Sequence, residues 1–279
     1  MTTVFLQATV AVRTADHDQA LAYLSLLPGL LGLEEREGDG EDLLLAAFDP
    51  VLVDQEALLA LTAAPPFLRC DLEELEQRNW MEPFRDFFTP VLLGERLAVV
   101  APAHCGSSPG LVEVVIDPGL GFGTGHHETT RLCLLHLLEY VRPGLRFLDL
   151  GTGSGILSIA AIKLGCAGAL GVDMDPDALD NARGNLCRNG VEALVTLLES
   201  TAGTEFRPHE LVAANIATVH LLPILPNAQA CTAPGGHLIV AGFLDEERDE
   251  VLRRALGRDF SLVAERSEGR WGSLVLRRT

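Results

Sequence analysis

Residues 148–165, LDLGTGSGILSIAAIKLG, combine a buried strand, a glycine-rich turn and an apolar helix. Gly151, Gly153 and Gly155 follow the strand at alternate positions. Glycine lacks a Cβ, so the backbone can approach a ligand closely, and the helix that follows can offer its unpaired N–H groups. The stretch therefore predicts a nucleotide-type site at the end of the first strand of an α/β domain.

The residues around these glycines distinguish two classes of ligand. A dinucleotide fingerprint requires GxGxxG, but Ile156 follows Gly155, so the pattern is GxGxG. Asp173, at the end of the next predicted strand, can accept both ribose hydroxyls of either ligand. Asp149, just before the glycines, suits a cationic methionine moiety better than a pyrophosphate. The combination favours S-adenosylmethionine over a dinucleotide, with Gly151, Gly153, Asp149 and Asp173 as cofactor-binding residues.

Two polar residues follow the next strands. Asp175 precedes Pro176, and we predict that it is the N-cap of a helix. Asn215 lies in VAANI, at the carboxyl edge where doubly wound sheets bind ligands. Its amide can receive the N–H of a substrate amine or hold cofactor, so Asn215 is a candidate for both catalysis and cofactor binding. The alternative is that Asn215 only caps a helix.

A second glycine-rich stretch, DPGLGFGTGHHETTRLCLLHLL (117–138), precedes the strand described above. We expect its glycines, Gly125 included, to form a lid over the cofactor. The helix that starts near Thr129 and Thr130 would then pack beside the sheet and bring this loop over its carboxyl edge.

The two histidines of this stretch raise the question of a metal. The zinc motif HExxH would need a histidine at position 131, where the chain has Arg131, and no other cluster of cysteine and histidine supplies ligands. We therefore expect no metal. His126 is a candidate for orienting a substrate or accepting a proton, with His127 as a second candidate.

Strands and helices alternate from residue 113 onward, which predicts a doubly wound α/β domain over residues 113–279 with an antiparallel strand near one edge. The predicted strands are RFLDLG, GALGVDMD, ALVTLLE, ELVAANI, HLIVAGFL, FSLVAERSE and WGSLVLRR.

The beginning of the chain has a different pattern. Residues 1–72 read as βαββαβ, with a hairpin turn at Gly38-Asp39-Gly40, and predict a small ferredoxin-like α+β domain. Residues 73–112 then form a linker helix and strand. The helix carries Trp80, Phe84, Phe87 and Phe88, which we expect to pack on one of the domains.

Composition limits the partners and the compartment. The 39 acidic and 21 basic side chains give a net charge of −18, which disfavours nucleic acid and anionic membranes and favours a basic protein. No apolar run is long enough to span a bilayer. Six cysteines without CxxC spacing predict free thiols in a reducing cytosol, and hence a cytoplasmic protein.

The motifs DPGLGFGTGHHETT, LDLGTGSGILSIAAIKLG and VAANI, in this order, resemble the bacterial ribosomal protein methyltransferases of the PrmA type. The resemblance is strongest over residues 113–245. It implies a class I Rossmann-like S-adenosylmethionine methyltransferase domain preceded by a ferredoxin-like substrate-recognition domain. It also implies methylation of lysine or N-terminal amines on large-subunit ribosomal protein eleven. The family's cofactor contacts fall on Thr130, Gly151, Asp173 and Asn215.

One position departs from the family. Thr89 stands before a proline where the family usually has a basic residue or histidine, so the acceptor is less firmly indicated than the chemistry. Three alternatives remain: a methyltransferase of the same fold acting on another protein or a small molecule, a binding module without activity, and a dinucleotide oxidoreductase.

Overall fold

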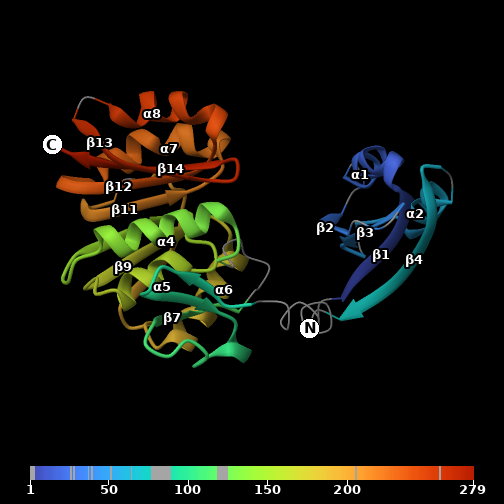
Figure 1. Ribbon diagram of the computed structural model, residues 1–279, viewed down its shortest axis with the longest axis horizontal. Coiled ribbons are helices and arrows are strands. Elements are labelled where there is room, and N and C mark those ends of the chain that lie inside the picture. Colours follow the sequence, from blue (N-terminus) through green and yellow to red (C-terminus); the bar gives the residue numbers. More distant parts are fainter. Residues whose placement is uncertain are drawn as a thin grey trace. The chain divides into compact units, whose positions relative to one another are not determined.

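The computed structural model describes the whole chain except residues 1–3, 26, 28, 37, 39, 51, 64, 77–88, 118–124, 205 and 258. The chain divides into two compact units, residues 1–84 and 85–279 (Figure 1). Most of the predicted aromatic linker helix lies outside the described residues.

The first unit is a four-stranded antiparallel sheet with two helices, in the order βαββαβ. The strands lie in the order β2-β3-β1-β4, so the hairpin of β2 and β3 is joined to β4 through β1. The elements are β1 (Val4–Arg13), α1 (His17–Ser25), β2 (Leu30–Arg36), β3 (Glu41–Phe48), α2 (Gln55–Thr62) and β4 (Phe67–Glu76).

Alternation along the strands builds the core of this unit. Leu6, Ala8 and Val10 of β1 are buried on one face of the sheet, where they pack with Leu24 of α1 and Leu58 of α2. Because successive side chains of a strand point to opposite faces, this spacing of two residues fixes the register of β1.

The second unit contains a seven-stranded sheet in the order β10-β9-β8-β11-β12-β14-β13. All seven strands predicted from the sequence are present. The first five are parallel, and β14 runs antiparallel between β12 and β13, which confirms the predicted antiparallel strand near one edge. The strands are β8 (Arg146–Leu150), β9 (Gly168–Asp173), β10 (Val195–Glu199), β11 (His209–Asn215), β12 (Thr232–Leu244), β13 (Phe260–Glu268) and β14 (Trp271–Arg278).

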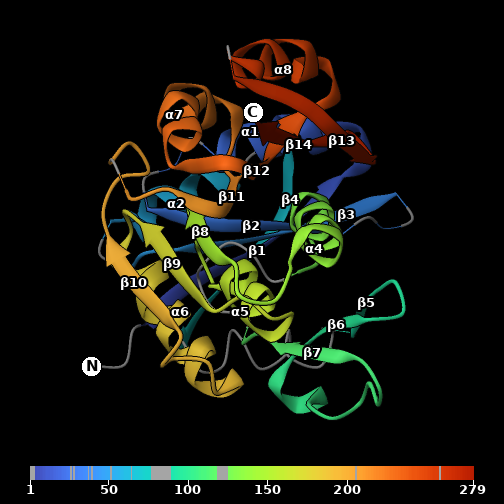
Figure 2. The same cartoon turned by 90° about the vertical axis from the view of Figure 1, so that its left-hand side faces the viewer.

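Helices cover both faces of this sheet, so β8 is buried on both sides. Phe147 faces α4 and α5, whereas Leu148 faces the layer that contains α7 and α8. Figure 2 shows the sheet between its two layers of helices. The helices are α4 (Glu128–Tyr140), α5 (Ile156–Lys163), α6 (Pro176–Asn189), α7 (Thr218–Ala230) and α8 (Arg248–Leu256).

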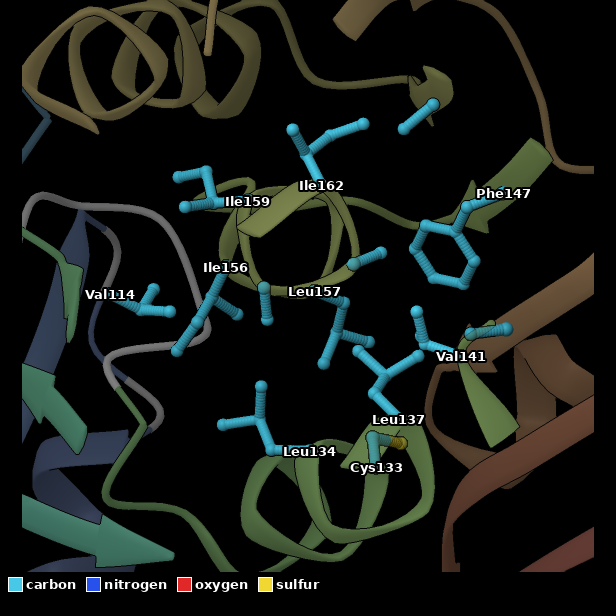
Figure 3. Packing of buried hydrophobic residues seen from close by; sticks show 14 of the residues in the cluster. Val114, Cys133, Leu134, Leu137, Val141, Phe147, Ile156, Leu157, Ile159 and Ile162 are labelled. Carbon is cyan, nitrogen blue, oxygen red and sulfur yellow. The ribbon is translucent and has the colours of Figure 1, made fainter. Parts of the chain in front are cut away.

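Helix α5 is buried on every side because it packs against the large sheet, α4, α6 and β7. Every residue from Ile156 to Ile162 is buried, as expected for a helix without a solvent face. Figure 3 shows Leu134 and Leu137 of α4 and Phe147 of β8 packed around it. The buried helix α5 therefore holds the glycine turn that precedes it in a fixed position.

A small sheet precedes the large one. Strands β5 (Val91–Leu93) and β6 (Leu97–Val100) are antiparallel, and β7 (Val112–Val115) pairs with β6 in parallel.

The described helices include none long and apolar enough to cross a membrane. The six cysteines all lie among the described residues and form no disulfide bond.

Candidate active site

A cavity of about 730 Å³ lies at the carboxyl edge of the large sheet, beside the point where the strand order reverses between β8 and β11. Its volume is within the range of roughly 300–1,000 Å³ found for small-molecule sites. Four of the residues predicted from the sequence line it: Gly151, Gly153, Asp173 and Asn215. The structure thus brings these four residues together, and their role in cofactor binding stays a prediction.

The backbone of the turn after β8 requires glycine. Gly151 has a φ of 74°, and a Cβ on it would lie 2.9 Å from Cγ1 of Ile216. The N–H groups of Gly151 and Thr152 both donate to the carbonyl oxygen of Val172, at 2.8 and 3.0 Å, which ties the turn to the end of β9. Any larger residue at 151 would strain the turn and narrow the cavity.

Asp173 connects the turn to the next strand. Its Oδ2 accepts the N–H of Gly153 at 2.8 Å, and its Oδ1 accepts the N–H of Asp175 at 3.2 Å. The carboxylate lines the cavity and is held in place from both sides. Asp175 itself is the N-cap of α6, where it accepts the N–H of Asp177 at 2.9 Å, as predicted.

Asp149 lies behind the turn rather than on the cavity lining. Its side chain is fully buried, and Oδ2 accepts the hydroxyls of Thr152 and Ser158, both at 2.8 Å, and the Ser158 N–H at 3.2 Å. Burial raises the pKa of Asp149 to about 6, against the opposing effect of these hydrogen bonds. The carboxylate therefore organises the glycine turn from beneath, and a direct contact with cofactor stays a prediction.

Asn215, at the end of β11, leaves one acceptor open. Its Nδ2 donates to Oγ1 of Thr130 at 3.5 Å, whereas its buried Oδ1 has no hydrogen-bond partner among the described residues. Thr130 is itself fully buried, in the first turn of α4. The N-cap of α7 is Ala217, so Asn215 is not a helix cap and that alternative is excluded.

The start of α4 forms another wall of the cavity. His127 is the N-cap of this helix, and its Nδ1 accepts the N–H of Thr129 at 3.3 Å. Nδ1 also lies 2.9 Å from the hydroxyl oxygen of Thr129. The edge of Trp271 meets this ring, with centroids 4.9 Å apart, and both side chains line the cavity.

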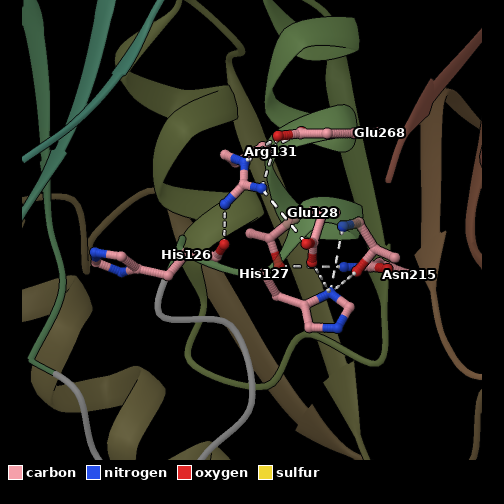
Figure 4. A network of polar contacts seen from close by, with 8 residues as sticks. His126, His127, Glu128, Arg131, Asn215 and Glu268 are labelled. Atoms are coloured by element: carbon pink, nitrogen blue, oxygen red, sulfur yellow. Dashed lines mark hydrogen bonds and ion pairs between the residues drawn. The ribbon is translucent and has the colours of Figure 1, made fainter. Parts of the chain in front are cut away.

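An ion pair joins α4 to the hairpin of β13 and β14. Arg131 donates through Nε and Nη2 to the Glu268 carboxylate, with the shortest distance 2.7 Å, and also donates to the carbonyl oxygen of His126 (Figure 4). This pairing is bidentate, which fixes the orientation of both groups. The residue that excludes a zinc motif in the sequence therefore holds the cavity wall in place.

Besides Asp149 and Thr130, two more predicted residues lie away from the cavity lining. The His126 ring points away from His127 and Asn215 in Figure 4 and is not among the residues that line the cavity. Gly125 is buried with a φ of 87°, and a Cβ on it would lie 2.8 Å from Cγ1 of Val99. Close packing against Val99 of β6 thus explains why position 125 requires glycine. The rest of the predicted lid, residues 118–124, lies outside the described residues.

Several lining residues were missed by the sequence analysis. Trp271 comes from the last strand, more than a hundred residues after the glycine turn, and no motif marks it. Met174 and the segment 200–203 line the side beyond Asp173, while Ala217, His220 and Pro223 line the α7 side. The described residues hold no group of histidine, cysteine and acidic side chains suited to a metal.

Comparisons with known proteins agree on one family. The profile described as "Ribosomal protein L11 methyltransferase (PrmA)" matches residues 42–279. A ribosomal protein L11 methyltransferase of Thermus thermophilus is 38% identical over 251 residues, covering 88% of this chain and 91% of that protein. One from Nitratiruptor is 36% identical over 250 residues, covering 88% and 87%.

A solved structure gives the same answer. The crystal structure of a ribosomal protein L11 methylase from Lactobacillus delbrueckii subsp. bulgaricus matches with a TM-score of 0.63 and 27% identity. It covers 68% of this chain and 99% of that one.

Proposed function

Since this chain belongs to the ribosomal protein L11 methyltransferase family, we propose that it transfers methyl groups from S-adenosylmethionine to amines of ribosomal protein L11. The acceptors in this proposal are lysine side chains, the N-terminal amine, or both. The observation that supports it most strongly is the unpaired Oδ1 of Asn215, a residue that lines the cavity together with the glycine turn and the Asp173 carboxylate. Such a reaction would place the enzyme in the cytoplasm.

The residues present fit the proposed cofactor. Gly151 and Gly153 present backbone without side chains to the cavity, and the Asp173 carboxylate can accept ribose hydroxyls while it holds the turn. When bound, S-adenosylmethionine supplies an electrophilic methyl group. Gly151, Gly153 and Asp173 would hold it, Thr130 would support the site through Asn215, and Asp149 would place negative charge beneath the turn.

Asn215 is suited to bind the acceptor amine. An amine nitrogen must direct its lone pair at the methyl group, so its N–H bonds need acceptors on the other side. The Oδ1 of Asn215 is such an acceptor, and the bond from Nδ2 to Thr130 keeps the amide in that orientation. Positioning of this kind provides much of the rate in transfers that need no covalent intermediate.

The other lining residues favour the neutral form of the amine. A lysine amine is protonated near neutral pH, with a pKa of about 10.4. Met174, Ile216, Pro223 and Trp271 give the cavity apolar surface, and desolvation disfavours an ammonium ion. His127 uses Nδ1 to cap α4, so the proton is best lost to water as the amine enters.

The first unit is proposed as the substrate-recognition domain, with a ferredoxin-like fold. Its strand order and its βαββαβ connectivity support the fold. Residues 1–76 contain fifteen acidic and three basic side chains, so this quarter of the chain carries about two thirds of the excess negative charge. A basic ribosomal protein is the partner that such a charge distribution favours.

The test is incubation of the purified protein with S-adenosylmethionine and recombinant L11, followed by intact-mass measurement. We expect L11 to gain mass in steps of one methylene, and Asp173→Ala to abolish the gain. Peptide mapping then identifies the amines. If L11 gains no mass while calorimetry detects bound cofactor, the methyltransferase acts on a different acceptor.

A further inference from the structure

The sequence contains two glycine-rich stretches, and one buried side chain connects them. Asn185 of α6 has no exposed surface. Its Oδ1 accepts the N–H of Asp117 at 2.9 Å, and its Nδ2 donates to the carbonyl oxygen of Ser154 at 3.0 Å. Asp117 is the first residue of the upstream stretch and is followed by residues 118–124, which lie outside the described residues, whereas Ser154 lies in the middle of the glycine turn.

No other side chain can make the set of hydrogen bonds that the Asn185 amide makes. A primary amide is the one neutral side-chain group that accepts at one atom and donates twice from another. Here the second N–H of Asn185 donates to Oδ1 of Asn181 at 3.1 Å, so the nitrogen is fully used. An aspartate would turn an oxygen toward the Ser154 carbonyl, and glutamine would be too long for a site without free space.

Packing around this amide is close. A Cβ on Gly155 would lie 3.3 Å from the Cβ of Ala182, so α6 rests directly against the turn. On the other side, Arg188 forms an ion pair with Asp117 at 2.7 Å. Helix α6 therefore holds both glycine-rich stretches, and Asn185 is the point at which a single group contacts both.

We propose that Asn185 is a positioning residue that couples the cofactor turn to the segment leading into the upstream glycine-rich stretch. Cofactor bound at the turn fixes Ser154, Ser154 fixes the Asn185 amide, and the amide fixes the backbone of Asp117. This inference rests on the proposed function, because it takes the glycine turn to be the cofactor site.

A matched control lies one helical turn away. Asn189 makes the same kind of contact with Val115, accepting its N–H at 2.9 Å and donating to its carbonyl oxygen at 2.6 Å. It has no bond to the glycine turn. Loss of Asn189 removes a comparable part of the packing of α6 on β7 but leaves the turn connected.

The experiment compares Asn185→Leu with Asn189→Leu, using S-adenosylhomocysteine as the probe, well below the unfolding temperature. Both variants should unfold at lower temperature. By calorimetry, we expect Asn185→Leu to raise the Kd about tenfold, equivalent to about 1.4 kcal/mol, and Asn189→Leu to change it less than about twofold. Equal Kd values in the two variants would overturn the proposal, since a purely structural role predicts them.

A measurement on the unchanged protein covers the case in which Asn185→Leu does not fold. Hydrogen exchange of the Asp117 backbone amide should slow about tenfold on saturation with S-adenosylhomocysteine, because local opening at Asp117 becomes less favourable by about 1.4 kcal/mol. The exchange rate of the Val115 amide should not change. Equal responses, or none at Asp117, would overturn the coupling.

The proposed function and the proposed role of Asn185 can fail independently. If the unchanged protein binds the probe but leaves L11 unmodified, the acceptor is wrong and the comparison still decides the role of Asn185. If the unchanged protein does not bind S-adenosylhomocysteine, the proposed function and the role of Asn185 are both wrong.

Discussion

Asp149 allows a quantitative test of the electrostatics beneath the glycine turn. The perturbation is Asp149→Asn, which keeps an acceptor oxygen for Thr152 and Ser158 and removes the ionisable group. Burial raises the pKa of Asp149 from 3.8 to about 6 in the folded chain. A carboxyl group with a raised pKa favours the folded state while it is protonated and loses that contribution as the pH rises through the folded value.

The magnitude follows from the size of this shift. Each pKa unit corresponds to about 1.4 kcal/mol, so the unfolding free energy of the unchanged protein should fall by about 3 kcal/mol relative to Asp149→Asn as the pH rises from about 4 to about 6.5. Above that pH the difference should be constant. All other titrating groups cancel, because both proteins contain them.

The assay is urea unfolding of both proteins at pH 4.5, 5.5, 6.5 and 7.5. Trp80→Phe serves as the common background, so that Trp271 reports the second unit alone. Carbon-13 NMR of the carboxyl group gives the pKa directly. A difference in unfolding free energy that does not change with pH would refute the reasoning. It would mean that the three hydrogen bonds to Oδ2 fully compensate for burial.

Three further predictions concern other parts of the cavity. Asn215→Ala should lower kcat/KM for L11 at least about tenfold by removing an amine acceptor, with bound cofactor still detected by calorimetry; unchanged kinetics would contradict that role. Gly242 has a φ of 94°, and a Cβ on it would lie 2.3 Å from the carbonyl oxygen of Ile216, so Gly242→Ala should lower the free energy of unfolding by about 3 kcal/mol or more. Gly235 has a φ of 74° but lies in open space, so Gly235→Ala should lower it by about 1 kcal/mol; thermal or urea unfolding measures both. Arg131→Met should destabilise the second unit by about 1–2 kcal/mol and weaken cofactor binding, because Glu268 loses a bidentate partner; equal stability in urea unfolding would show that the pair is dispensable.

The sequence predicted those parts of the site that depend on local chemistry. Gly151 and Gly153 follow a strand, Asp173 ends the next strand, and Asp175 precedes a proline, so each position could be inferred from neighbours in the chain. The same holds for the strands of the large sheet, whose apolar runs are long enough to recognise.

What the sequence could not predict depends on contacts between distant residues. Trp271 lines the cavity because β14 is inserted between β12 and β13, and no local pattern shows this. Asp149 and His126 lie away from the cavity lining for a similar reason. The hydroxyls of Thr152 and Ser158 hold the Asp149 carboxylate, and Arg131, which pairs with Glu268, donates to the carbonyl oxygen of His126. Only the assembled fold brings these groups together.

The position of the β13–β14 hairpin has a consequence for how the protein is made. The glycine turn around Gly151 leaves the ribosome before Glu268 and Trp271 have been translated, and these late residues hold the start of α4 and complete the cavity wall. Contacts between segments so far apart form late in folding. A nascent chain that already carries the complete glycine motif is thus not yet able to enclose its ligand, and ligand binding reports that the final hairpin has docked.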